Sequence, residues 1–97
     1  MNIDLEKNNG LCKLQIEGEM TIYNSAELKK QLLKSLPECS QVEIDLSQVS
    51  EMDTAGFQLL LLVYNEASLL NVTVRIASYS SAVSAVFDLY SINKEDF

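Results

Sequence analysis

The strongest constraint on the fold is a strand pattern that changes, within a few residues, into the pattern of a buried helix. Val42, Ile44 and Leu46 alternate with acidic residues, which predicts a strand over 41–46 with one buried face. After a short polar turn, apolar residues cover almost the whole circumference of a helix predicted over 55–70. Such a helix is either buried deeply or presents an apolar face to a partner.

The other segments extend this alternation of strands and helices. Apolar periodicity predicts strands over 2–7, 11–17 and 72–77, helices over 24–36 and 81–90, and a polar tail over 91–97. Asn8-Asn9-Gly10 favours a hairpin turn between the first two strands. The order β-β-α-β-α-β-α predicts an α/β fold, a mixed sheet with helices packed on it. In that sheet the strand at 41–46 should be central and parallel to a neighbour.

Composition limits the number of domains and the classes of partner. The 97 residues are 47% hydrophobic, which suits one domain spanning 1–97. The net charge of −7 argues against binding to nucleic acid and to anionic membrane surfaces. The start of the chain lacks the pattern of a signal peptide, and no apolar run approaches the length of a membrane span. We therefore expect a cytoplasmic protein without membrane insertion.

The two cysteines, Cys12 and Cys39, lie far apart in the sequence among apolar or small neighbours. In a reducing compartment such residues are usually buried free thiols, so we expect both to stay reduced. Because the chain contains no histidine, the two cysteines also make a poor metal site.

The residues needed for common enzyme chemistries are missing. There is no histidine to serve as the base of a serine or cysteine nucleophile, and no glycine-rich loop of the kinds that bind nucleotide phosphates. Most of the 14 acidic residues fall on the polar faces of the predicted elements. We therefore predict that the protein is not an enzyme, with no catalytic residues, cofactor or metal.

The turn Asp53-Thr54-Ala55-Gly56 is the main candidate for a functional site. It joins the end of a predicted strand to the start of a helix, where free backbone N–H groups stabilise negative charge, including phosphate. Asp53 or Thr54 could simply cap the helix. The Thr54 hydroxyl could instead be a modification site, and these interpretations stay open on the residues alone.

The stretch DLSQVSEMDTAGFQLLL resembles the signature of STAS domains, the sulfate-transporter and anti-sigma-factor-antagonist family. The matching residues are Asp45, Leu46, Ser47, Val49, Met52, Asp53, Thr54 and Gly56, with Phe57 in place of the usual Leu. Two further segments, 16–20 and 78–88, also resemble the family, in the same order along the chain.

The resemblance implies a single STAS domain in a bacterial signalling protein that controls transcription by partner switching. In stand-alone members, the hydroxyl after the motif aspartate is phosphorylated, and that residue is Thr54 here. The unphosphorylated form would bind a Ser/Thr kinase-type anti-sigma factor, and a phosphatase would restore it. The residues implied in partner binding are Asp53, Thr54, Ala55, Gly56, Phe57, Glu19 and Thr21.

The same motif supports a second interpretation. The chain is also similar to STAS proteins of chemotaxis gene clusters and to the STAS subunit of a Gram-negative lipid-asymmetry transporter. The chain would then be a constitutive subunit of a lipid-transport ABC complex or a chemotaxis assembly. Thr54 would act mainly as a contact and a helix cap.

Overall fold

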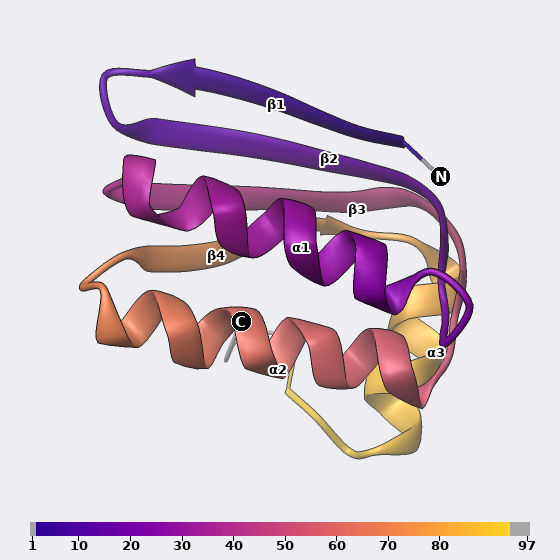
Figure 1. Ribbon diagram of the computed structural model, residues 1–97. Helices are drawn as coiled ribbons and strands as arrows, with labels where there is room; N and C mark the ends of the chain where they lie inside the picture. The colour runs from indigo at the N-terminus through magenta and orange to yellow at the C-terminus, as the bar shows by residue number, and fades with distance from the viewer. Residues whose placement is uncertain (1, 94–97) are drawn as a thin grey trace.

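The computed structural model describes residues 2–93 and has the predicted order of elements. Along the chain these are β1 (Asn2–Asn8), β2 (Leu11–Met20), α1 (Ser25–Ser35), the 3-10 helix η1 (Leu36–Glu38), β3 (Gln41–Met52), α2 (Thr54–Leu69), β4 (Thr73–Tyr79) and α3 (Ser81–Leu89). Figure 1 shows the four strands side by side, with α1 and α2 crossing one face of the sheet.

The sheet is mixed and has the order β1-β2-β3-β4. β1 and β2 form the predicted antiparallel hairpin, in which Asn9 and Gly10 both have positive φ. β3 pairs in parallel with β2 on one side and with β4 on the other. The prediction that the strand at 41–46 is central and parallel to a neighbour is therefore confirmed.

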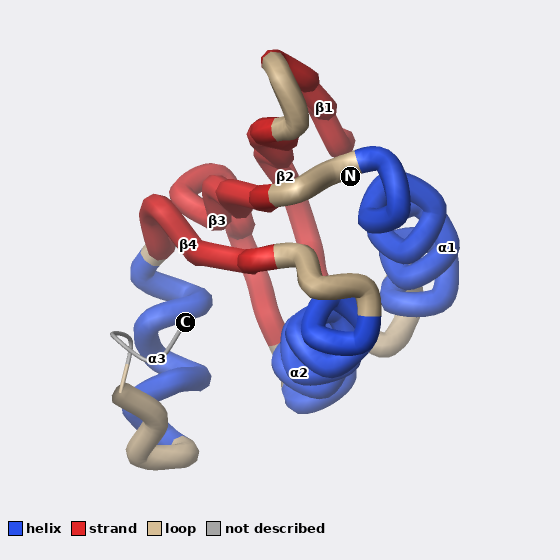
Figure 2. The backbone as a smooth tube through the Cα atoms, turned by 90° about the vertical axis from the view of Figure 1, so that its left-hand side faces the viewer, coloured by secondary structure: helices blue, strands red, loops and turns tan. Residues whose placement is uncertain are grey.

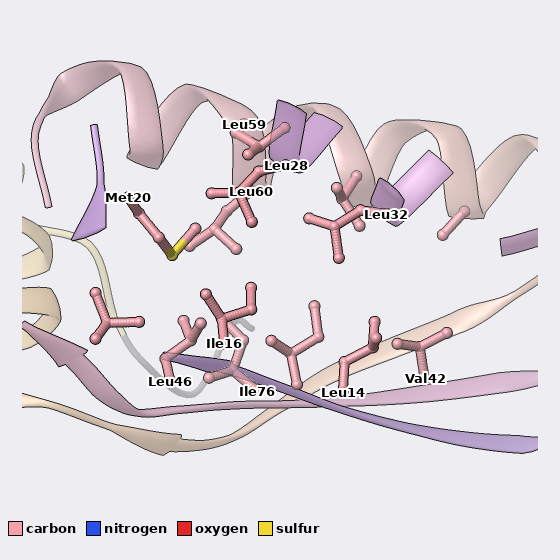
Figure 3. Close-up of a cluster of buried hydrophobic side chains, with 14 of the residues drawn as sticks. Leu14, Ile16, Met20, Leu28, Leu32, Val42, Leu46, Leu59, Leu60 and Ile76 are labelled. Carbon is pink, nitrogen blue, oxygen red and sulfur yellow. The ribbon is translucent and has the colours of Figure 1, made fainter. Parts of the chain in front are cut away.

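The helices form two unequal layers. α1 and α2 lie on one side of the sheet, whereas α3 lies on the other (Figure 2). The main core fills the space between the sheet and the α1–α2 layer, where strand and helix side chains point toward one another (Figure 3). Val42, Ile44 and Leu46 are all almost fully buried, as the alternation in the sequence predicts.

All four strands run past their predicted ends, and β2 and β3 do so the furthest. β2 continues past residue 17 to Met20, and β3 continues past residue 46 to Met52. Their pairing is irregular near Gly18, which has a φ of 101°. A strand irregularity disrupts the alternation of inward and outward side chains, so periodicity alone could not find these extensions.

The expectation of two free thiols was wrong, because Cys12 and Cys39 form a disulfide. β2 and β3 are parallel neighbours, so α1 and η1 must return the chain to the end of the sheet where β2 begins. This return places Cys39 beside Cys12, with 5.9 Å between their Cα atoms, a separation typical of disulfides. Distance along the sequence did not reveal this proximity.

Residues 2–93 contain neither a membrane-spanning helix nor a cluster of metal-binding side chains. None of the helices within residues 2–93 combines the length and the apolar character needed to cross a bilayer. Over the same residues, no three cysteine or acidic side chains are grouped so that they could hold a metal ion. The predicted tail is described only as far as residue 93, and its remainder lies outside the described residues.

Candidate functional site

The candidate site is the junction at which β3 ends and α2 begins, next to the loop that follows β2. Asp53 is the N-cap of α2, and its Oδ1 accepts a hydrogen bond of 3.1 Å from the Gly56 amide. Its Oδ2 accepts a second bond of 3.0 Å from the Ile22 amide. One carboxylate therefore caps the helix and ties it to the β2–α1 loop.

Gly56 allows the helix to approach the end of β2 closely. The Asp53 amide donates to the Met20 carbonyl oxygen over 3.3 Å, so the start of α2 lies directly against this strand. A Cβ atom on Gly56 would lie 2.2 Å from the same oxygen. Real Cβ atoms essentially never come this close to another atom, so the junction requires glycine here.

The hydrogen bonds that Asp53 accepts shift the pKa of its carboxyl group. Donation from the Ile22 amide, followed by donation from the Gly56 amide, lowers the pKa of the Asp53 carboxyl. Because the folded pKa lies below the unfolded pKa, the carboxylate stabilises the fold above the unfolded value of about 4. This stabilisation is lost as the pH falls through the folded pKa.

We expect Asp53→Asn to retain the cap, because asparagine caps helices well, but to lose the charge-assisted bond from Ile22. The variant should be less stable than wild type at pH 7, and the difference should shrink below about pH 4. Urea unfolding of both proteins at pH 7 and pH 3 measures this change. The pKa of Asp45 is also lowered. Because Asp45 is present in both wild type and variant, its titration cancels in the difference between their stabilities. A difference independent of pH would contradict the role of the charge.

Thr54 is the first residue of α2, and its side chain lies at the surface. Its Oγ1 is 2.6 Å from the hydroxyl oxygen of Tyr90, the residue that ends α3. The Tyr90 ring stacks on Phe57, with 5.3 Å between ring centroids and 18° between planes. Phe57 also makes an edge contact with Phe87 of α3. The candidate hydroxyl is therefore joined to α3 through an aromatic cluster.

The structure brings the predicted residues together at one end of the sheet, but at different depths. Thr54 and Glu19 are exposed, whereas Asp53 and Ala55 are half-buried. Gly56 and the side chains of Phe57 and Thr21 lie in the interior and shape the site from within. The Thr21 hydroxyl has no hydrogen-bond partner among the described residues.

Three exposed residues at this site were not singled out by sequence reasoning. Ile22 and Tyr23 in the β2–α1 loop are 68% and 93% exposed, and Tyr90 is 42% exposed. The Tyr90 ring stacks on Phe57, and the residue stays partly exposed. Two adjacent apolar residues shortly after the segment 16–20 were the signal available in the sequence for Ile22 and Tyr23.

A surface groove of about 320 Å³ lies between α1 and α2 and reaches the candidate site at Ala55. Its lining combines small, apolar and polar side chains: Ser25, Ala26, Lys29, Ala55, Gln58, Leu59 and Leu62. The lining of the groove, the β2–α1 loop and Thr54 are together called the α2 start surface below.

Comparison with known proteins identifies the family. The family model described as STAS domain matches residues 2–96. The anti-sigma-B factor antagonist of Bacillus subtilis (strain 168) is 21% identical over 89 residues, which are 92% of this chain and 82% of that protein.

Solved structures of the same kind share the fold. The anti-sigma factor antagonist SpoIIAA in its unphosphorylated form aligns with a TM-score of 0.77 and 16% identity, over 94% of this chain and 82% of that chain. The Bacillus cell fate determinant SpoIIAA in the phosphorylated form aligns with a TM-score of 0.73 and 15% identity, over 94% and 85%. With a family match over nearly its whole length, the chain is a member of the STAS domain family.

Proposed function

We propose that this chain is an anti-sigma-factor antagonist or a related partner-switching regulator, controlled by phosphorylation of Thr54. Unphosphorylated, it would bind a Ser/Thr kinase-type anti-sigma factor, and a phosphatase would regenerate this form. The chain would act by binding and serve as the substrate of the kinase. The observation that carries the proposal is the position of Thr54: an exposed hydroxyl on the first residue of a 16-residue helix, beside an aspartate cap.

The chemistry of the site suits phosphoryl transfer to Thr54. Oγ1 would attack the γ-phosphorus of ATP, the bond between that phosphorus and ADP would break, and the hydroxyl proton would pass to a base of the kinase. The helix N-terminus would stabilise the phosphate by about 0.3–1 kcal/mol, while the charge of Asp53 would oppose it. Because these local effects nearly cancel, we expect the overall fold to survive modification.

The α2 start surface supplies what a protein partner would contact. Ile22 and Tyr23 offer exposed apolar area, and the adjacent groove offers a concave surface. A phosphate on Thr54 would place a charge of about −1.5 to −2 at the edge of this surface. Burying that charge against a partner suited to a neutral hydroxyl is costly, so phosphorylation would release the partner.

We expect Thr54→Ala to bind the kinase-type anti-sigma factor like unmodified wild type, and Thr54→Glu to bind at least about tenfold more weakly. Calorimetric titration measures the affinities, and intact mass after incubation with partner and ATP measures phosphate gain. Wild type should gain one phosphate and Thr54→Ala none. Unfolding curves should accompany each titration, because loss of the threonine side chain also changes the helix start.

Thr73→Glu is the matched control, since Thr73 is exposed at the opposite end of the sheet, where β4 begins. This control should bind like wild type. If wild type gains no phosphate and Thr54→Glu also binds normally, phosphorylation of Thr54 does not control partner binding, and the proposed function is wrong. Stable, stoichiometric binding to a transporter or chemotaxis subunit would then favour the constitutive-subunit alternative.

A further inference from the structure

We propose that Tyr90 is the residue that responds to the state of Thr54, because a phosphoryl group on Oγ1 and the docked Tyr90 hydroxyl exclude each other. This inference rests on the proposed modification of Thr54. It adds a positioning residue at the C-cap of α3, 36 positions away from Thr54 along the chain.

The exclusion follows from the short distance between the two hydroxyls. The Tyr90 oxygen lies only 2.6 Å from Thr54 Oγ1. Where Oγ1 donates this bond, the phosphoryl group replaces the hydrogen that points at Tyr90. Its oxygens would lie about as far from Oγ1 as the Tyr90 oxygen does, so they need the space that Tyr90 now occupies. In the same arrangement, with Oγ1 as donor, this hydrogen bond must also break before Oγ1 can transfer its proton to a kinase base.

The aromatic contacts determine which part of the molecule responds. Tyr90 is held in place by its stacking on Phe57, and Phe57 packs deeply against Phe87. Phe57 and Phe87 are buried, whereas Tyr90 lies at the rim and is partly exposed. The ring of Tyr90 can therefore move outward without opening the core.

The backbone at the end of α3 would move with the ring. The Tyr90 backbone amide donates to the Val86 carbonyl oxygen over 3.2 Å, and the Ile92 amide donates to the Phe87 carbonyl oxygen over 2.8 Å. These bonds close the last turn of α3, next to Leu89, which is 75% exposed. Phosphorylation would thus loosen this turn and change the apolar surface that it presents.

The test uses the full chain with phosphothreonine incorporated at position 54, without any partner. Residue-level amide exchange and the Tyr90–Phe57 ring contact are followed by NMR. We expect the contact to weaken and the Tyr90 and Ile92 amides to exchange about 2- to 12-fold faster, the range that corresponds to losing one stacked aromatic pair. Amides in the centre of β3 should keep their rates.

Tyr90→Phe separates this role from a purely structural one. The variant keeps the ring on Phe57 but vacates the space that the phosphoryl group needs. Phosphothreonine at position 54 should therefore leave exchange at the end of α3 nearly unchanged in this variant. An equal response in Tyr90→Phe and wild type would overturn the proposal, as would no response in wild type or an equal rise in β3.

These measurements are independent of the partner titration. Loss of partner binding on phosphorylation without a change at Tyr90 would support the switch and overturn the role of Tyr90. A change at Tyr90 without loss of partner binding would support the role of Tyr90 and overturn the proposed switch.

Discussion

Gly56→Ala should destabilise the protein by about 3 kcal/mol or more, because the added methyl group has no space. It would lie 2.2 Å from the Met20 carbonyl oxygen, a backbone atom that cannot rotate away. Alanine favours a helix over glycine by about 1 kcal/mol, but this gain is smaller than the cost of forcing α2 away from β2. Urea unfolding at neutral pH measures the loss.

Ala55→Gly provides a control in the same helical turn. It removes a methyl group from a half-buried position and should cost no more than about 1 kcal/mol, through helix propensity. A Gly56→Ala variant as stable as wild type would show that the junction can relax. The bonds between Asp53 and the β2–α1 loop would then not depend on this close approach.

Reduction of the disulfide between Cys12 and Cys39 should lower the free energy of unfolding by about 3.5 kcal/mol, from the entropy of closing a loop between residues 27 apart. The bond ties β2 to the segment that enters β3, and both sulfur-bearing residues are buried. Because disulfides persist in oxidising compartments and are reduced in the cytoplasm, the stability of this domain should depend on its redox environment.

Unfolding with and without a phosphine reductant measures the effect. The double variant Cys12→Ala with Cys39→Ala is the control, and its unfolding midpoint should not respond to the reductant. Thiol titration of unfolded, non-reduced wild type should find no free thiol. Two free thiols under these conditions would show that both cysteines are reduced and that no disulfide contributes to stability.

Hydrophobic periodicity was enough to predict the order and type of the elements, because it records which face of each strand or helix is buried. It also placed the candidate site, since Asp53 and Thr54 follow a strand pattern and precede a helix pattern. Asp53 was one of two candidate caps, and the structure selects it through the bond from the Gly56 amide.

The contacts between residues that are distant in the sequence depend on how the elements pack in three dimensions. The extensions of β2 and β3 depend on pairing around Gly18, where the side-chain alternation is broken. The disulfide depends on α1 and η1 returning the chain to the start of β2. The contact between Thr54 and Tyr90 depends on how α3 packs against the start of α2. Local patterns report the burial of each residue but not the identity of its neighbour across the core, so these contacts could not be read from the sequence.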